Sequence, residues 1–250
     1  MITIKRRHEF DLMARAGAAI AEIHRALRDA AVPGIETAEL DRIAAAIIAD
    51  HGCTSSFLNY HGFPAHVCVS PNDTVVHGIP GSWRVSEGDI ISVDAGAIYE
   101  GWHADAAVTF AVGEVSDAAV ALLEATGLAL EAGIAAAVPG NRLGDVGHAI
   151  ESVARAAGLG VIREYTGHGI GRQMHEEPQV LNYGNPGTGL RLKPGMALAI
   201  EPMFTVGGEH TRVIDDGWGV VTADGSLSAH FEHTVAITAD GPRVLTAAPK

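Results

Sequence analysis

Apolar residues recur at helical spacing in two stretches at the start of the chain. Over residues 8–29 they fall three or four positions apart, at Phe10, Met13, Ala16, Ile20, Ile23 and Leu27. A Val-Pro-Gly break at 32–34 ends this pattern. A second pattern begins at Thr37, a residue type that caps helices, and stops near Gly52. The chain is therefore predicted to open with two helices in succession.

The same order of elements then occurs again. Short β-rich runs fill residues 53–113, and residues 117–137 return to helical spacing behind Ser116 as a cap. Val-Pro-Gly recurs at 138–140, and a shift by the same interval pairs Leu40 with Val146, Ile47 with Val153 and Gly52 with Gly158. A helix that matches the second one is therefore predicted after the second Val-Pro-Gly, with β-rich chain following it.

This repetition predicts a duplicated α+β fold. Its halves cover about residues 1–113 and 114–250, and each is a helix pair followed by strands. The sequence has no linker, low-complexity segment or charge block that would separate independent domains, so residues 1–250 are predicted to form a single domain. A cleft between such halves is a favoured place for a functional site.

Two aspartates interrupt an apolar hairpin pattern in "DIISVDAGAIYEGWHADAAVTF" (89–110). Asp94 follows one apolar run, Glu100-Gly101 marks a turn, and Asp105 lies on the return strand. A hairpin would bring the two aspartates close together, within a register slip. Neighbouring carboxylates on an apolar sheet repel each other, so the pair needs a shared proton or a cation.

Two glutamates show the same peculiarity further along the chain. Glu201 follows Ala-Leu-Ala-Ile in "GMALAIEPMF", and Glu232 precedes Thr-Val-Ala-Ile in "AHFEHTVAIT". Glutamate is depleted in strand centres. Each acid alone is more often a charge at a strand edge, but four such acids predict a common site.

A histidine set among glycines completes the candidate centre. His168 lies in "YTGHGIGRQMHEEPQV" between Gly167 and Gly169, with Gly171 beyond, and the glycines are expected to let a metal ion or substrate approach the imidazole. One imidazole and four carboxylates form an oxygen-rich donor set, which predicts two divalent ions rather than a cysteine-based zinc site. Taken alone, His175 and His77 would be solvated loop histidines.

Composition narrows the functional classes. The 250 residues carry a formal net charge of −13 and are 47% hydrophobic. The negative charge disfavours nucleic-acid and anionic-membrane partners, because such binding relies on Lys and Arg. No membrane span is predicted, since no apolar run of about 18 residues is free of charge. The two cysteines, Cys53 and Cys68, show no disulfide pattern, so a cytoplasmic location is expected.

Together these motifs resemble the type I methionine aminopeptidases, whose fold is called pita-bread. The resemblance covers nearly the whole chain and follows the family's order. It rests on "NDTVVHGIP" (72–80), "DAGAIYEGWHAD" (94–105), "YTGHGIGRQMHEEPQV" (165–180), "AIEPMF" (199–204) and "FEHT" (231–234). It implies pseudo-symmetric halves and a central antiparallel sheet flanked by helices.

The resemblance also implies a ligand set. Asp94, Asp105, His168, Glu201 and Glu232 match the family's five metal ligands. Asp105 and Glu232 match the carboxylates that bridge both ions, His168 and Glu201 would complete the shell of one ion, and Asp94 that of the other. The cofactors would be two divalent ions, with Mn, Co, Fe and Zn all suited to such a site.

Further positions match the family's substrate site. His77 and His175 match the histidines that contact substrate and, with Glu201, take part in catalysis, whereas the methionine pocket would be lined by Tyr60, Phe63, Cys68 and Trp218. Three positions depart from the commoner pattern. These are Phe57 in place of a cysteine, Met174 in place of an aromatic residue and Ala106 in place of a threonine.

The implied activity is metal-dependent removal of the initiator methionine when the next residue is small, by attack of a water activated at two ions. The implied substrates are nascent polypeptide N-termini, with the ribosome as a further candidate partner and a monomer as the expected state. Two alternatives remain open: a proline-specific metallopeptidase of the same fold and an inactive binding module of that fold. The former usually carries a long N-terminal domain, and the latter typically loses metal ligands.

Overall fold

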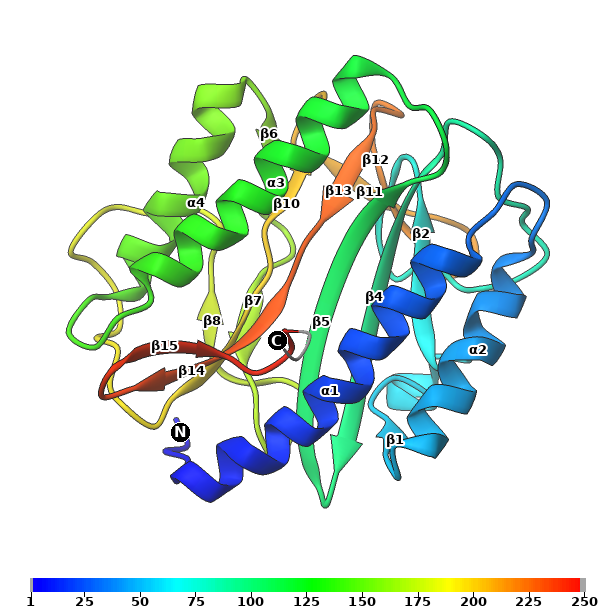
Figure 1. Cartoon of the computed structure of the whole chain (residues 1–250). Helices are drawn as coiled ribbons and strands as arrows, with labels where there is room; N and C mark the ends of the chain where they lie inside the picture. The colour runs from blue at the N-terminus through cyan, green and yellow to red at the C-terminus, as the bar shows by residue number, and fades with distance from the viewer. Residues whose placement is uncertain (1, 248–250) are drawn as a thin grey trace.

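The computed structural model of the chain describes residues 2–247 (Figure 1). The helices are α1 Arg7–Ala30, α2 Thr37–Asp50, α3 Asp117–Ala136 and α4 Leu143–Ala157, with a 3-10 turn, η1, at Tyr60–Gly62. The strands of the first half are β1 Thr54–Ser55, β2 Val67–Pro71, β3 Thr74–Val76, β4 Ile90–Tyr99 and β5 Trp102–Ala111. Those of the second half are β6 Gly160–Val161, β7 Gly167–Gly169, β8 Glu176–Val180, β9 Ala197–Ile200, β10 Met203–Thr205, β11 Thr211–Val213, β12 Val220–Thr222, β13 Ser228–His230, β14 His233–Thr238 and β15 Gly241–Val244.

The two helix pairs occupy equivalent places in the two halves. α1 packs on α2 and covers β4 and β5, whereas α3 packs on α4 and covers β9, β10 and β13 (Figure 1). The turns before α2 and α4 use glycines with matching backbone angles, Gly34 at φ 97° and Gly140 at φ 99°. The helices are followed by a second matched pair, Gly52 at φ 65° and Gly158 at φ 69°. Such angles favour glycine, which explains why the sequence repeats it at these positions.

The predicted helix caps had different outcomes. Ser116 caps α3 as predicted, because its hydroxyl accepts a hydrogen bond from the backbone N–H of Ala119 at 3.2 Å. The prediction for Thr37 was wrong, since Glu36 takes the cap position of α2. The Thr37 hydroxyl instead donates to the carbonyl of Gly81 at 3.1 Å and accepts from its N–H at 2.9 Å. It ties the helix to a distant loop, a contact that local sequence does not encode.

The sheets are antiparallel throughout the strand pairs described. β4 is flanked by β5 on one side and by β1 and β2 on the other, and a five-stranded sheet has the order β15-β14-β9-β7-β8. Smaller sheets have the orders β13-β10-β6 and β11-β12-β3. The two larger sheets adjoin where β5 lies beside β14. There the Thr234 hydroxyl accepts from the N–H of Asp105 at 2.9 Å and donates to its carbonyl at 2.8 Å, so the halves join at a predicted site residue.

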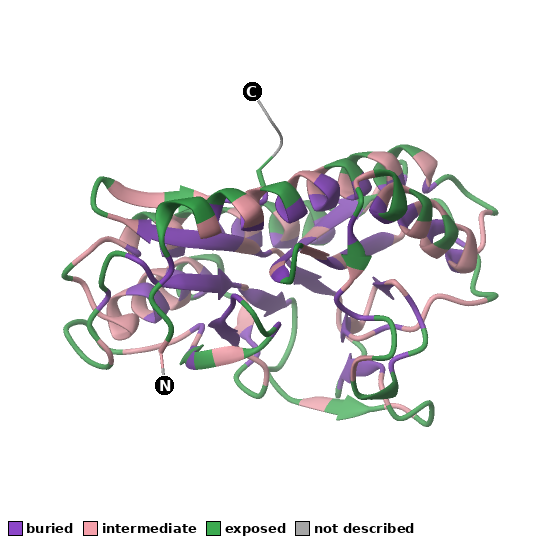
Figure 2. Cartoon of the chain, turned by 90° about the horizontal axis from the view of Figure 1, so that it is seen from below, coloured by how far each residue is buried: buried purple, intermediate pink, exposed green. Residues whose placement is uncertain are grey.

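The buried strands lie beneath a row of helices, with loops and short strands on the opposite side (Figure 2). α3 is long and apolar enough to cross a membrane by length and composition. In this structure it packs against α4 and the strands of the second half, with Leu122 and Leu130 in the core. We therefore interpret α3 as a core helix.

Candidate metal centre and active site

The predicted site residues converge on one cavity. A hollow of about 310 Å³ is lined by all five predicted metal ligands, by both candidate histidines and by the four predicted pocket residues. The ligands come from both halves: Asp94 from β4, Asp105 from β5, His168 from β7, Glu201 from the position just after β9 and Glu232 from the short connection between β13 and β14. The site therefore lies where the duplicated halves meet, as expected for a cleft between them.

The two aspartates lie close on one face of the β4–β5 hairpin. Glu100 at φ 48° and Gly101 at φ 76° form its tight turn, as the sequence predicts. The register places Asp94 opposite Ala107 and Gly96 opposite Asp105, so the aspartates are diagonal neighbours. Because directly paired residues share a face of the sheet, both carboxylates point to the same side.

His168 has its ring orientation fixed by the backbone. Its Nδ1 lies 2.9 Å from the carbonyl oxygen of Gly169, and since a carbonyl can only accept, Nδ1 carries the proton. Nε2 then keeps a free lone pair and lies 3.6 Å from Oε1 of Glu201. An imidazole whose other nitrogen donates to a carbonyl is the usual arrangement of a histidine metal ligand.

The glycines around His168 have a different role from the one expected. A Cβ on Gly167 would meet the carbonyl oxygen of Ala199 at 2.3 Å, and one on Gly169 that of Glu177 at 2.2 Å. At Gly171 it would meet Cε of Lys5 at 2.5 Å. The neighbouring strands and Lys5 fill this space, so the expectation that the glycines admit metal or substrate was wrong. Gly167 and Gly169 are required by close packing of backbone against backbone, and Gly171 by the side chain of Lys5.

The acidic cluster is strongly affected by burial. Burial raises the pKa of Asp94 to about 7 and that of Glu201 to about 8. Burial and the neighbouring carboxylates raise the pKa values of Asp105 and Glu232 well above their usual range. Burial also lowers the pKa of His168 to about 3, which keeps the imidazole neutral. Four ionised carboxylates therefore need a compensating positive charge in this cavity.

The donor atoms fit divalent metal ions. Among residues 2–247, Oδ1 of Asp94, Oδ1 of Asp105 and Oε1 of Glu232 are buried without a hydrogen-bond partner. Buried polar atoms are rarely left unpaired, because each costs about 1–3 kcal/mol. Ligand atoms of Asp105, His168 and Glu232 lie within 4.8 Å of one another. A carboxylate set with imidazole suits Mn, Fe, Co or Zn, so the residues present fit the metals expected.

The predicted methionine pocket adjoins this centre. The ring of Phe63 meets that of Trp218 edge to face at 5.1 Å, and Trp218 lies near His77 at 6.5 Å. Cys68 is buried in the same apolar cluster, against which Tyr60 packs. These side chains form an apolar wall next to the acids.

The three positions that depart from the family pattern fall in two places. Phe57 and Met174 belong to the same apolar cluster as Cys68 and line the cavity. Ala106 instead packs in the core of the first half, on the opposite face of β5 from Asp105. We therefore expect only Phe57 and Met174 to shape the pocket.

His175 is held at the edge of the cavity by an aromatic neighbour. The Tyr60 hydroxyl lies 2.8 Å from Nδ1 of His175, and burial raises the pKa of this hydroxyl, which keeps it protonated. The His175 ring lies 4.3 Å, centroid to centroid, from that of His168. His175 is exposed, but the contact with Tyr60 holds its ring in place at the cavity.

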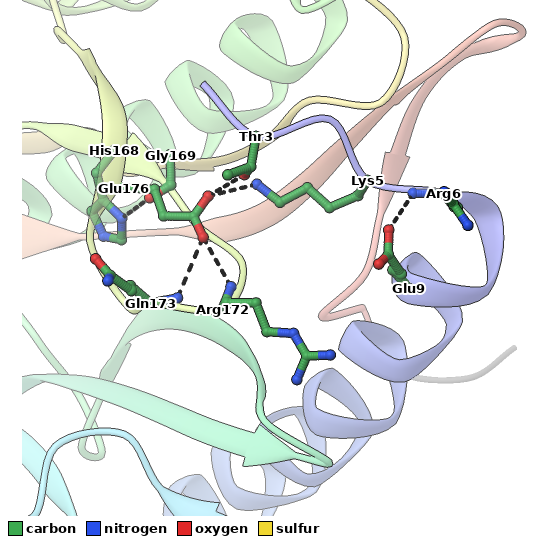
Figure 3. Close-up of polar contacts among 9 residues, drawn as sticks. All are labelled: Thr3, Lys5, Arg6, Glu9, His168, Gly169, Arg172, Gln173 and Glu176. Atoms are coloured by element: carbon green, nitrogen blue, oxygen red, sulfur yellow. Dashed lines mark hydrogen bonds and ion pairs between the residues drawn. The ribbon is translucent and has the colours of Figure 1, made fainter. Parts of the chain in front are cut away.

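The loop that leads into His175 is fastened by the next residue, Glu176 (Figure 3). Its Oε1 accepts from the N–H groups of Arg172 at 2.9 Å and Gln173 at 3.3 Å. Its Oε2 accepts from Nζ of Lys5 at 2.8 Å and from the hydroxyl of Thr3. The Lys5 and Glu176 side chains are only 3% and 8% exposed. This ion pair ties the N-terminal segment to the loop beside the metal centre.

We expect Glu176→Gln to destabilise the protein by about 3 kcal/mol, because it leaves the Lys5 ammonium buried without its counter-ion. Turnover should fall as well, since the loop before His175 loses its anchor. The measurements are urea unfolding and steady-state kinetics. The matched control, Lys5→Met with Glu176→Gln, removes the unpaired charge and should recover most of the lost stability. A single variant as stable as the wild type would contradict this role of the ion pair.

Two features of the site were not predicted from the sequence. His230 lines the cavity, with its Nε2 3.5 Å from Oε2 of Glu201. The signal that could have found it is its position two residues before Glu232, the spacing that puts two side chains on one face of a strand. Burial lowers the pKa of His230, with Asp94 acting in the opposite direction. The Lys5–Glu176 pair joins residues 171 positions apart, so no local signal pointed to it.

The fold and the acid-rich centre define a metallopeptidase of the pita-bread class. The chain belongs to metallopeptidase family M24, whose sequence profile matches residues 11–239, and within it to the type I methionine aminopeptidases. It is 56% identical over 245 residues to methionine aminopeptidase 1 of Mycobacterium tuberculosis, covering 95% of this chain and 92% of that protein. It is 48% identical over 246 residues to the methionine aminopeptidase of Clostridium perfringens, covering 98% and 99%.

Solved structures agree with this assignment. The crystal structure of methionine aminopeptidase from Thermotoga maritima matches with a TM-score of 0.97 and 45% identity, over 99% of this chain and 100% of that one. The prolidase of Pyrococcus furiosus matches with a TM-score of 0.79 and 21% identity, over 99% of this chain but 66% of that one. The second likeness shows the shared fold alone, which confirms the predicted pita-bread architecture.

Proposed function

We propose that this chain removes the N-terminal methionine from newly made proteins and peptides when the next residue is small. The single observation that carries the proposal is that one cavity holds both a buried set of metal-type ligands and an apolar pocket. The relatives named above, which match over nearly their whole length, support the same activity. The substrate's free α-amino group would lie at the acidic end and its methionine side chain at the apolar end.

We infer that Asp94, Asp105, His168, Glu201 and Glu232 would hold two divalent ions, with Asp105 and Glu232 as the carboxylates that would serve both. Bound there, the ions would lower the pKa of water so that hydroxide is available near neutral pH. Mn, Co, Fe and Zn are the candidates, because each accepts carboxylate and imidazole ligands.

Glu201 is the proposed proton carrier. Its carboxylate would take a proton from the attacking water and later deliver it to the leaving amine. His77, whose pKa burial lowers to about 4, stays neutral and would hold the substrate backbone or assist the leaving nitrogen.

His175 is the proposed donor to the scissile carbonyl oxygen. If the protonated Tyr60 hydroxyl donates to Nδ1, the neutral ring carries its hydrogen on Nε2. That N–H can then donate to the oxygen as negative charge develops on it. Tyr60 would thus fix the tautomer that this step requires.

The pocket explains a preference for methionine. Phe63, Cys68 and Trp218 provide an apolar, polarisable lining that suits an unbranched thioether. Crowding around the next residue would restrict it to small side chains. We further propose a monomer that acts in the cytoplasm on nascent chains, with the ribosome as a candidate docking partner.

The deciding experiment incubates the Mn- or Co-loaded protein with Met-Ala-Ser and, separately, with proline-containing peptides. Release of free methionine from Met-Ala-Ser alone would support the proposal. Cleavage of the proline peptides alone would favour the proline-specific alternative, in keeping with the shared fold. Absence of cleavage together with absence of bound metal by elemental analysis would favour an inactive binding module.

We expect His175→Ala to lower kcat on the order of 10²-fold, the lower part of the range for losing one preorganised donor. The effect should fall mainly on kcat rather than KM, because the interaction strengthens as charge develops. Tyr60→Phe should give a smaller loss in the same direction. Steady-state kinetics on Met-Ala-Ser measure both effects.

Folding and metal content should stay unchanged in His175→Ala. The exposed His210, changed to Ala, provides the control and should leave kcat unaltered. An unchanged kcat in His175→Ala would remove His175 from the mechanism, and a loss of bound metal would make it a ligand instead.

A further inference from the structure

His230 is a histidine at the end of β13 that the five-ligand centre does not use. Its side chain is 2% exposed and lines the cavity that holds the acids. Within the part of the chain that the structure describes, neither Nδ1 nor Nε2 has a hydrogen-bond partner. Both nitrogens of a buried imidazole are thus unpaired next to the candidate metal centre.

Two unpaired ring nitrogens in a buried histidine destabilise the protein unless a bound group interacts with them. A neutral imidazole has one N–H donor and one lone pair, and each buried polar group left unpaired costs about 1–3 kcal/mol. The strand backbone nearby is already engaged. The backbone carbonyl of His230 accepts a hydrogen bond from the Thr109 hydroxyl at 2.8 Å, and the backbone N–H of His230 donates to the Thr109 hydroxyl oxygen at 2.8 Å. The side chain is therefore held in the cavity by a fixed backbone.

The closest acidic group lies at a distance suited to a shared ion. Nε2 of His230 is 3.5 Å from Oε2 of Glu201, which is long for a direct hydrogen bond. Ligand atoms of His230, Glu201 and Glu232 lie within 4.8 Å of one another. Glu201 thus stands between two imidazoles, with Oε1 facing His168 at 3.6 Å and Oε2 facing His230 at 3.5 Å.

We propose that His230 is a sixth protein ligand of the metal centre and binds an ion together with Glu201 and Glu232. The inference rests on the proposed metal centre and adds a second imidazole to it. Imidazole favours Zn, Co and Fe, whereas a carboxylate-dominated site suits Mn equally well. The second imidazole therefore biases this centre toward Zn and Co and away from Mn.

The main rival role for His230 is a hydrogen bond that merely orients the Glu201 carboxylate. Loss of an orienting residue weakens every metal that Glu201 binds by a similar factor. Loss of a nitrogen ligand weakens most the metals that prefer nitrogen. The two roles can therefore be distinguished by comparing metals, independently of activity.

The experiment titrates metal-free wild type, His230→Gln and the exposed-histidine control His210→Gln with Zn and with Mn. We expect His230→Gln to lower Zn affinity by at least about 10- to 100-fold. Loss of a residue that only supports a metal ligand already costs that much, and His230 would be a ligand itself. Mn affinity should change much less, and the control should match the wild type. Equal losses for Zn and Mn, or no loss of either, would overturn the ligand assignment.

A second measurement needs no variant and so does not depend on the variant's folding. Proton NMR of the Co-loaded wild type should show strongly shifted exchangeable ring N–H signals from two ligating histidines, His168 and His230. A single such signal would overturn the proposal. Methionine release is assayed separately, because a protein that binds metal through His230 but releases no methionine would refute the proposed activity and leave this ligand intact.

Discussion

Removal of the divalent ions is expected to abolish methionine release from Met-Ala-Ser, and added Mn or Co is expected to restore it. The buried acids, with His168, form a centre that we expect to supply the nucleophile only when it holds metal. The loss should exceed about 10³-fold, because a bound ion contributes several kcal/mol of stabilisation to the reaction and each 1.36 kcal/mol is a factor of ten. The measurement is free methionine released before and after treatment with EDTA. Full activity in protein shown to be metal-free would contradict the proposal that methionine release depends on bound ions.

The same treatment should change how stability depends on pH. In the metal-free folded protein, burial raises the pKa of Asp94 to about 7 and that of Glu201 to about 8, and burial with neighbouring carboxylates raises the pKa values of Asp105 and Glu232 well above their usual range. The unfolded chain has already lost these protons near pH 5, so between pH 7 and 8.5 the folded state holds more protons than the unfolded one. Stability must therefore fall as pH rises, by about 1.4 kcal/mol per pH unit for each proton held.

Buried histidines do not reverse this trend in the chosen window. Burial lowers the pKa values of His24, His77, His168 and His233, so they cost stability only below the ordinary histidine pKa of 6.5. Between pH 7 and 8.5 they are neutral in the folded state and mostly neutral in the unfolded chain. We expect the Tm of metal-free protein to fall over this range and that of metal-loaded protein to stay nearly level. A parallel course of the two Tm curves would contradict our description of the buried acids.

Asp105→Asn is the substitution with the next largest expected effect. As a carboxylate shared by both ions, Asp105 should matter more for metal content than Asp94, which we assign to one ion. We expect Asp105→Asn to retain almost no metal and to lose about 10³-fold or more in kcat/KM, since several kcal/mol depend on the ions. Asp94→Asn is the matched control on the partner strand and should keep about one ion per chain.

Stability gives an independent test of the same substitution. Asparagine cannot ionise, so the variant avoids the cost of keeping this buried carboxyl group protonated when the unfolded chain has lost the proton, and metal-free Asp105→Asn should be more stable than metal-free wild type at pH 8. With metal present the order should reverse, because only the wild type gains binding energy. Elemental analysis and thermal unfolding measure the two effects. Equal metal loss in both aspartate variants would argue against the bridging role of Asp105.

Some site contacts follow from local pattern and others do not. The register of the β4–β5 hairpin follows from its Glu100-Gly101 turn and from alternation, so the closeness of Asp94 and Asp105 was predictable. The clamp between Lys5 and Glu176 was not, because it joins two segments 171 residues apart in sequence. Nor was the role of Gly171, whose missing Cβ makes room for Lys5.

The sequence by itself determined the duplicated order of helices and strands, the identities of the acids and of His168, and the family. These follow from periodicity, turn residues and motif spacing, which act over a few residues at a time. Only the tertiary structure decided which nitrogen of His168 is free, how deeply the acids are buried and that His230 lies beside Glu201. Those properties depend on packing between the two halves, where burial sets each pKa and distant strands set each distance.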